Sequence, residues 1–168
     1  MATVPQFDDS IAGGIIQPSI HRRFPFTSER PSQTDALDRI AAFLDGPKRF
    51  FILEGPTGFG KSPVAIAAAE FAGSAYIISP QKALTAQYMR DFESHGLRDL
   101  KGAANYDCGF GLDCETAAVL YGHANHIESC DGYIPAREAF KTAAVGVINF
   151  SYYLSCRCEV EALVGCPR

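Results

Sequence analysis

Residues 54–62, with the sequence Glu-Gly-Pro-Thr-Gly-Phe-Gly-Lys-Ser, constrain the fold of this chain more than any other stretch. They lie between an apolar run at 50–53 and a helix-like run at 64–71. Glycine, four residues and Gly-Lys-Ser between a strand and a helix form the P-loop pattern, in which backbone N–H groups and a helix N-terminus cradle phosphate. The sequence therefore predicts a nucleotide-binding α/β fold. A Gly-rich turn with a surface lysine is the less favoured alternative.

The P-loop pattern gives the polar residues at its end defined roles. Lys61 would reach the β- and γ-phosphates of ATP, and the Ser62 hydroxyl would hold Mg²⁺. Both are our candidate catalytic residues. The candidate nucleotide-binding residues of the loop are Gly55, Pro56, Thr57, Gly58, Phe59, Gly60, Lys61 and Ser62.

Composition limits the class of protein. A chain of 168 residues with 47% hydrophobic and 20% charged residues is typical of one soluble globular domain. It contains neither a membrane-spanning apolar run nor a secretory signal pattern, so we expect a cytoplasmic protein. Its six cysteines are then expected to be free or metal-bound rather than disulfide-paired. The net charge of −4 gives no global support for nucleic-acid binding.

The stretch before the P-loop predicts a helix with a glutamine in its first turn. Pro31 suits the first turn, and Gly46-Pro47 ends the helix. Its apolar face consists of Ala36, Leu37, Ile40, Ala41 and Leu44. The amide of Gln33 can donate and accept hydrogen bonds, which is what reading an adenine edge requires. From the residues alone, that role and an ordinary exposed polar residue are equally favoured.

The rest of the chain alternates predicted strands and helices, as in a parallel α/β sheet. A short buried strand at 49–54 leads into the P-loop, and a helix ending at Gly73 leads to a strand at 75–79. A right-handed crossover would make these two strands parallel. The chain then predicts a helix at 81–92 with Leu84, Tyr88 and Phe92 on its buried face, a helix at 134–144 and a core strand at 145–149.

Polar residues follow the strand at 75–79. Ser79, Gln81 and Lys82 lie at its carboxyl end, where ligands bind in open α/β sheets. Their hydroxyl, amide and ammonium groups could hold a nucleic-acid phosphate. A plain helix cap is the alternative.

Three cysteines surround a Gly-rich region with little periodicity. Cys108, Cys114 and Cys130 lack the paired spacing of a zinc ribbon. Three thiolates could hold an iron–sulfur cluster if a fourth ligand exists. The candidates for that ligand are His123, His126, Cys156 and Cys158, among which spacing does not choose. Three unrelated cysteines are as well favoured as a cluster, and a zinc site ranks behind both.

Several stretches occur in an order that points to one family. They are, in one-letter code, FPF at 24–26, RPSQ at 30–33, GPTGFGKS at 55–62, SPQKALTAQYMRDF at 79–92, LKGAANYDC at 100–108, AREA at 136–139 and VGVINFSYYL at 145–154. Together they resemble the iron–sulfur superfamily-2 DNA helicases of the XPD/DinG type, and most closely the phage and bacterial DinG-like branch. The P-loop alone is shared by many NTPases, whereas this combination is much more specific.

The resemblance implies a role for each stretch. Arg30 and Gln33 would form the nucleotide-reading glutamine motif, and residues 55–62 would be helicase motif I. Residues 79–84 would be motif Ia, which touches the backbone of single-stranded DNA, and residues 149–154 would precede motif II. The cysteines at 108, 114 and 130 would be ligands of a [4Fe–4S] cluster.

The resemblance also implies a domain organisation and an activity. The fold would be α/β, an incomplete RecA-like P-loop NTPase sheet with a cysteine-bearing insertion. Its parts would be a leader at 1–23, RecA-like residues at 24–105, the insertion at 106–133, a return to the RecA-like domain at 134–154 and an atypical tail at 155–168. Family members couple ATP hydrolysis to 5′-to-3′ translocation on single-stranded DNA.

Two departures from the family affect the predicted function. Only three of the usual four cysteines align, and the sequence has no Asp-Glu-x-His box and no second RecA-like domain. We therefore expect an ATP-binding portion of a helicase that a second polypeptide completes. The alternatives are a non-hydrolysing module for ATP and single-stranded DNA and a small metal-binding interaction protein.

An incomplete sheet should also expose apolar surface, including part of 145–148. We therefore expect the isolated chain to be poorly soluble.

Overall fold

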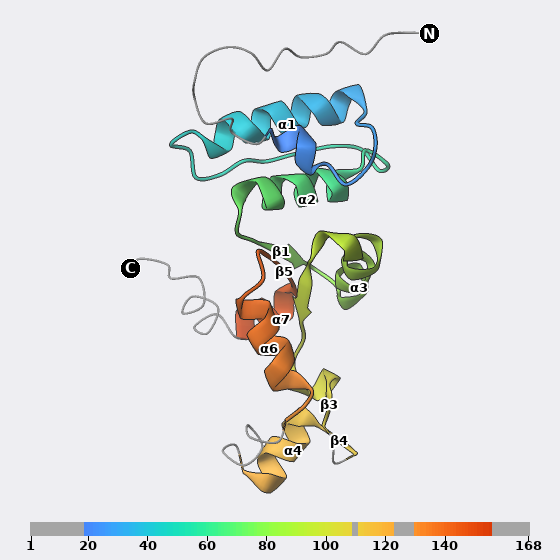
Figure 1. Ribbon diagram of the computed structural model, residues 1–168, viewed down its shortest axis with the longest axis vertical. Coiled ribbons are helices and arrows are strands. Elements are labelled where there is room, and N and C mark those ends of the chain that lie inside the picture. The colour runs from blue at the N-terminus through green and yellow to red at the C-terminus, as the bar shows by residue number, and fades with distance from the viewer. Residues whose placement is uncertain (1–18, 109–110, 123–129, 156–168) are drawn as a thin grey trace.

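The computed structural model describes residues 19–108, 111–122 and 130–155. The molecule is elongated, with stacked helices at one end, a small parallel sheet in the middle and a cysteine-bearing part at the other end (Figure 1). Within these residues, no helix has the length and apolar character needed to cross a membrane. Residues 1–18 of the predicted leader at 1–23 and residues 156–168 of the predicted tail lie outside the described residues. The end of the predicted leader, Ile20–Arg23, is a 3₁₀ helix with Ile20 buried in the core, so it is part of the fold.

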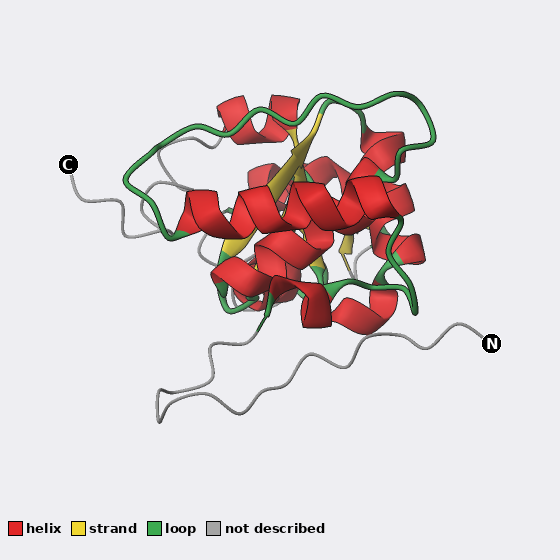
Figure 2. Cartoon of the chain, turned by 90° about the horizontal axis from the view of Figure 1, so that it is seen from above, coloured by secondary structure: helices red, strands yellow, loops and turns green. Residues whose placement is uncertain are grey.

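The helical end consists of η1 (Ile20–Arg23), α1 (Pro31–Leu44) and α2 (Lys61–Ala72). Seen from above, α1 lies across the other helices (Figure 2). The residues buried between them are Ile20, Ala36, Leu37, Ile40, Val64 and Ala67. The predicted helix at 31–46 and the predicted end of the next helix at Gly73, which has φ 77°, are both confirmed. Glycine suits this left-handed C-cap because it has no Cβ.

The sheet has three parallel strands in the order β1 (Ala75–Ser79), β5 (Val145–Asn149) and β2 (Arg98–Leu100). In its register Ala75 lies opposite Val145, and Arg98 lies opposite Gly146. The elements around the sheet are α3 (Lys82–Asp91), η2 (Glu93–His95), α6 (Tyr133–Lys141) and α7 (Phe150–Ser155). This is a mixed α/β fold consistent with part of a RecA-like helicase domain, as the sequence predicted.

The cysteine-bearing part is built from short elements. They are η3 (Ala103–Asn105), the antiparallel pair β3 (Asp107–Cys108) and β4 (Leu112–Asp113), and α4 (Cys114–Tyr121). Asp113 caps α4, because its carboxylate accepts a 2.9 Å hydrogen bond from the Thr116 backbone N–H. The sequence pattern predicted no regular element between Cys108 and Cys130, so β4 and α4 were not predicted.

The predicted strand at 49–54 is wrong for this structure. The segment is extended, but it pairs with no other strand among the described residues. Phe50 is 88% exposed and Ile52 is 91% exposed, so the segment is not buried either. A strand needs a hydrogen-bonding neighbour, and β1 pairs with β5 instead of with this segment. The predicted parallel pairing of 49–54 with 75–79 is therefore absent.

Two expectations about burial are also wrong. All of Val145–Asn149 is buried, because β5 is the central strand, with β1 and β2 on its two edges. Tyr88 of α3 and Phe92, which caps the end of α3, face the core as predicted, but Leu84 is exposed and Thr85 is buried in its place. The buried Thr85 hydroxyl forms a 2.7 Å hydrogen bond with the Ser79 hydroxyl, so its polar group is satisfied in the interior.

Candidate functional site

The P-loop runs from the exposed segment at 50–53 to the first turn of α2. Gly58 and Gly60 have φ of 83° and 86°, a region that residues with a Cβ rarely adopt. A Cβ at Gly60 would also collide with the side-chain nitrogen of Gln33. These two positions therefore require glycine, as the sequence pattern predicted for a tight phosphate-binding turn.

Lys61 is the first residue of α2 and bends back over the loop. Its Nζ donates hydrogen bonds to the carbonyl of Gly55 at 2.7 Å and to that of Pro56 at 3.1 Å. Ser62 follows in the first helical turn and is half-buried. The ammonium group, the N-terminus of a helix and the glycine turn thus lie together. This arrangement fits an anionic phosphate group and, at Ser62, an accompanying Mg²⁺.

Gln33 connects α1 to the P-loop. Its side chain is buried, with 5% of the residue exposed. Its Nε2 donates to the Phe59 carbonyl at 2.9 Å, and its Oε1 accepts from the Arg30 backbone N–H at 2.9 Å. The interpretation as an ordinary exposed polar residue is therefore wrong. The Nε2 and Oε1 atoms of Gln33 each make one hydrogen bond and can each make a second, so the reading of adenine by Gln33 stays a prediction.

Arg30 contacts the same loop as Gln33. Its Nη1 donates a 2.5 Å hydrogen bond to the carbonyl of Gly58. Arg30 and Gln33 therefore hold two consecutive carbonyls of the loop, those of Gly58 and Phe59. The sequence placed both residues in one nucleotide-reading motif but gave no signal for these backbone contacts.

The polar residues after β1 divide between the interior and the surface. Ser79 is 3% exposed, and its Oγ donates to the Gln81 carbonyl at 3.0 Å. The Ser79 hydroxyl is therefore used inside the protein and is not presented to a phosphate. Gln81 and Lys82 are exposed at the start of α3, where Lys82 Nζ donates to Asn105 Oδ1 at 3.1 Å.

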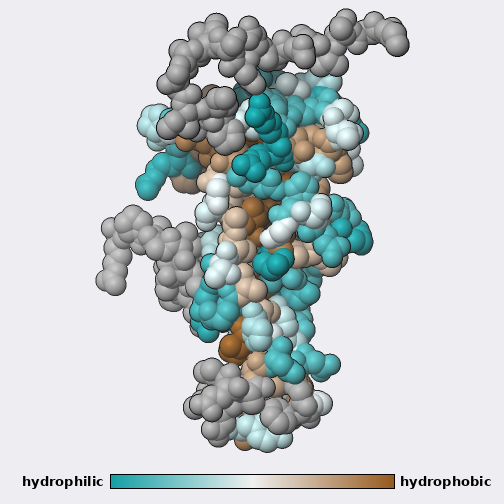
Figure 3. All heavy atoms as spheres, viewed as in Figure 1, coloured by the Kyte–Doolittle hydropathy of each residue, from teal (hydrophilic) through white to brown (hydrophobic). Residues whose placement is uncertain are grey.

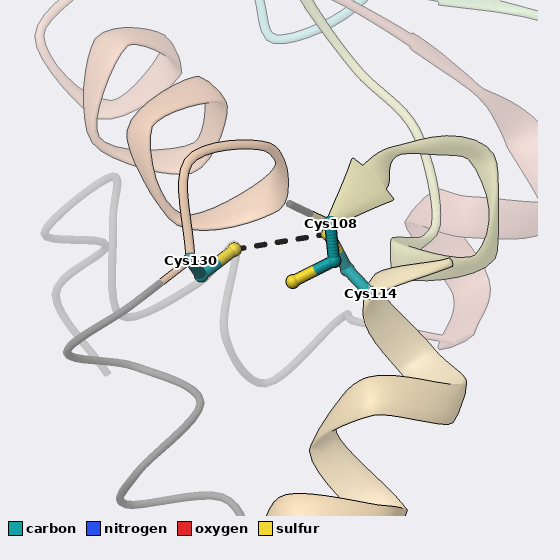
Figure 4. Close-up of side chains that lie close together, drawn as sticks. All are labelled: Cys108, Cys114 and Cys130. Carbon is teal, nitrogen blue, oxygen red and sulfur yellow. Dashed lines mark hydrogen bonds between the residues drawn. The ribbon is translucent and has the colours of Figure 1, made fainter. Parts of the chain in front are cut away.

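The three cysteines of the insertion meet in space. Cys108 comes from β3, Cys114 begins α4, and Cys130 precedes α6 (Figure 4). All three are buried, and their sulfur atoms lie within 4.8 Å of one another. The Sγ atoms of Cys114 and Cys130 are 3.7 Å apart. The interpretation as three unrelated cysteines is therefore wrong.

The protein environment makes the three thiols unequal. Burial raises the pKa of Cys108 and raises that of Cys114 to about 11. Burial also opposes ionisation of Cys130. Hydrogen bonds from backbone N–H groups outweigh this effect of burial and lower the pKa of Cys130. The first of these groups is the N–H of Ile134, whose nitrogen lies 3.4 Å from the Cys130 Sγ. A thiolate beside the first turn of α6 is stabilised in this way. Cys130 is therefore the thiol that ionises most readily.

The sulfur positions fit a single thiophilic metal ion. Thiolates bound to one zinc ion at 2.3 Å lie about 3.8 Å apart in a tetrahedron, close to the separation of Cys114 and Cys130. A four-iron cluster carries one thiolate on each iron and so spreads its ligands further apart. The described spacing of the three sulfur atoms, all within 4.8 Å of one another, is therefore closer to that of ligands around one ion than to that of ligands around a cluster. The candidate fourth ligands 123, 126, 156 and 158 lie outside the described residues.

Comparisons with known proteins give one family match. The profile of the family described as type III restriction enzyme, res subunit, matches residues 27–117, which is more than half of the chain. The match includes α1, the P-loop, α2, α3, the first half of α4 and two of the three clustered cysteines. No curated protein and no solved structure gave a match.

Proposed function

The chain belongs to the type III restriction enzyme res subunit family, and we propose that it is the ATP-binding portion of a DinG-like DNA helicase. A helicase-like domain in this family implies ATP, Mg²⁺ and nucleic acid. The DinG-like assignment is narrower than the family match. It rests on the order of motifs from FPF at 24–26 to VGVINFSYYL at 145–154.

The observation that carries the proposal is the way the P-loop is held. Lys61 Nζ lies 2.7 Å from the Gly55 carbonyl, so the lysine is already positioned over the glycine turn. A bound triphosphate would offer the ammonium a fully charged acceptor in place of neutral carbonyls, and such charge-assisted bonds are stronger. Arg30 and Gln33 fix the loop from α1. On this proposal Lys61 binds the phosphates, and Arg30 and Gln33 hold the loop that orients them.

The finer parts of the proposal concern DNA and the cysteines. Exposed Lys82, at the start of α3, is our candidate for contact with the backbone of single-stranded DNA. Cys108, Cys114 and Cys130 would hold a [4Fe–4S] cluster, with a fourth ligand and a wider sulfur spacing than described. A cluster there would give the cysteine-bearing part a rigid frame.

The hydrolytic step needs groups beyond those described above. The sequence contains no Asp-Glu-x-His box, whose acidic pair binds Mg²⁺ and positions water in the family that the chain resembles. We propose that another polypeptide segment supplies this pair. On this proposal residues 24–105 and 134–154 form one ATP-binding unit, interrupted by the insertion at 106–133.

Nucleotide binding by the chain and its Lys61→Ala variant tests the proposal. The wild type should bind fluorescent ATP in the presence of Mg²⁺, and Lys61→Ala should bind at least about tenfold more weakly, because an ion–phosphate bond is lost. Lys48→Ala, which removes an exposed lysine upstream of the loop, is the matched control. Equal affinity of all three proteins would reject the nucleotide site. Appreciable ATP turnover stimulated by single-stranded DNA would reject the need for another segment.

A second candidate function has its own support. Three buried thiols within 4.8 Å favour a metal-binding module even if the P-loop carries no nucleotide. Metal analysis of the purified chain, with failure to bind ATP, would favour this candidate over the helicase proposal.

A further inference from the structure

Two of the three clustered thiols lie close enough to bond to each other. The Sγ atoms of Cys114 and Cys130 are 3.7 Å apart, although their positions differ by 16 in the sequence. The sulfur atoms of a disulfide are about 2.05 Å apart, so this pair must approach by about 1.7 Å. Rotation of each side chain about its Cα–Cβ bond can shorten the distance between the two sulfur atoms.

The backbone around the two cysteines leaves room for this approach. Cys114 is the first residue of α4, and Cys130 precedes α6, so neither is held in the interior of a helix or strand. Gly132 follows Cys130 closely, and a Cβ at Gly132 would lie only 3.0 Å from the Cys114 Sγ. The Cys114 thiol therefore lies against the chain that carries Cys130, as a disulfide between them requires.

The hydrogen bonds of the two thiols are weak and do not oppose oxidation. The Cys114 thiol donates to the Asp107 carbonyl at 3.6 Å, and the Ile134 N–H donates to the Cys130 Sγ at 3.4 Å. A disulfide has no S–H donor, but its sulfur atoms remain weak acceptors. Oxidation therefore removes the first of these bonds and keeps an acceptor for the second.

A covalent link at this place would connect a weakly packed helix to the sheet. In α4 the buried residues are Cys114, Ala117 and Ala118, whereas Val119 is 74% exposed. In contrast, α6 packs on the sheet, where the ring of Phe140 stacks on that of Tyr76 with centroids 5.3 Å apart. Figure 3 shows that the described part of the molecule narrows towards the cysteine-bearing end. A bond between the two cysteines would therefore hold the start of α4 to the chain that enters α6.

We propose that Cys114 and Cys130 form a reversible disulfide when no metal is bound, which makes the cysteine-bearing part sensitive to redox conditions. Figure 4 shows the three side chains converging from different elements. The disulfide removes two of the three thiolates, so disulfide formation and metal binding exclude each other. The inference goes beyond the proposed function, because it concerns the thiols alone and requires neither nucleotide nor DNA.

The oxidant in this proposal is a small disulfide such as oxidised glutathione. Cys130 reacts first, because it is 8% exposed whereas Cys114 is fully buried. The Cys130 sulfur attacks one sulfur of the reagent, which gives a mixed disulfide and releases one glutathione thiolate. The Cys114 sulfur then attacks the Cys130 sulfur and releases the second. The two cysteine protons pass to the released thiolates, so two thiols are oxidised for each reagent disulfide reduced.

Oxidation of the full chain in glutathione buffer with a chelator tests the proposal. Cleavage after glutamate separates residues 94–115, which contain Cys108 and Cys114, from residues 129–138, which contain Cys130. We expect the oxidised protein to give these two fragments linked through Cys114, as read by tandem mass spectrometry, and reduced glutathione to separate them. Oxidation in urea is the control. It should give mixed pairings among the six cysteines, because the unfolded chain does not select a pair.

Two variants and added zinc test which thiols react. Cys108→Ser should still form the link, whereas Cys114→Ser should form it at least about tenfold more slowly. Zinc added to the wild type before oxidation should also slow the link at least about tenfold, because metal-bound thiolates are not available for attack.

Amide hydrogen exchange provides a readout on the wild type that needs no variant. In the metal-free protein, exchange in α4 should slow at least about tenfold on oxidation, because the disulfide restricts local opening. A link from Cys130 to Cys108 or to a cysteine at 156–168 would overturn the proposal. So would thiols that remain reduced while the chain in urea oxidises, or α4 exchange that oxidation leaves unchanged.

Discussion

The two ends of the molecule are stabilised in different ways. The nucleotide-binding end has a core of packed side chains between η1, α1 and α2, and its loop is fixed by Arg30, Gln33 and Lys61. The cysteine-bearing end has a hairpin of two strands with two residues each, an eight-residue helix and a buried cluster that includes three thiols. The first end can fold before its ligand arrives, whereas the second has little core apart from its metal-binding groups.

Substitution of Cys114 should have the largest effect and should be confined to one end. Cys114 is fully buried, with its Sγ 3.7 Å from that of Cys130. Cys114→Ser should weaken metal binding at least about 100-fold, because a metal-binding thiolate is lost. Amide hydrogen exchange should then accelerate in β3, β4 and α4 and stay unchanged in α2.

Metal analysis of the anaerobically purified chain provides the reference for this variant. Zinc in a colourless protein would favour the single ion that the sulfur spacing fits, and iron with sulfide would favour the cluster. Val119→Ser on the same helix is the control for exchange. If α4 were equally protected in Cys114→Ser and the wild type, the cysteine-bearing end would fold without its metal-binding groups, and the contrast between the two ends would be lost.

Substitution of Gln33 should have a moderate effect at the other end. Gln33→Ala leaves the Phe59 carbonyl and the Arg30 N–H without their side-chain partner, which costs about 1–3 kcal/mol. We expect a lower melting temperature and ATP affinity reduced about tenfold, since the loop loses its link to α1. Titration with fluorescent ATP measures the affinity. Gln87→Ala, an exposed glutamine on α3, is the matched control, and equal ATP affinity of the two variants would contradict this role.

Local sequence signals predicted the elements whose stability is local. The apolar spacing at 36–44, the glycine at 73 and the glycines of the P-loop each act within one or two turns of chain, and α1, α2 and the loop agree with them. Segment 49–54 has strand-forming residues but no strand partner among the described residues. A local pattern cannot supply the partner, so this prediction was wrong.

The candidate sites show the same limit. The P-loop motif identified Lys61 and Gly60. The cysteine spacing left a ligand set and three unrelated cysteines equally favoured, and only the family resemblance grouped the three thiols that meet within 4.8 Å. The bonds of Arg30 and Gln33 to loop carbonyls depend on how α1 packs, which no motif encodes. Helix α4 was missed because it is short, although Asp113 followed by Cys-Glu-Thr is a recognisable N-cap signal.

The smallest effect is expected from His21, which ties η1 to α1 at the nucleotide-binding end. Its ring nitrogens lie 2.9 Å from a Glu29 oxygen and 3.0 Å from an Asp38 oxygen. Burial lowers the pKa of His21, but hydrogen bonds with Glu29 and Asp38 outweigh it and raise the pKa above 6.5. Stabilisation by the protonated ring is therefore fully present below the unfolded pKa and is lost as pH rises through the folded pKa.

Urea unfolding of His21→Gln at pH 6, 7.5 and 9 tests this pH dependence. The wild type should be more stable than the variant by about 1 kcal/mol at pH 6, and the difference should shrink toward pH 9. Arg39→Gln removes the ion pair between Arg39 and Asp35, which involves no histidine, so its effect should stay constant. A His21→Gln effect that is equally constant would mean that the ring acts by packing. The nucleotide-binding end would then depend on core contacts and loop hydrogen bonds without this charged link.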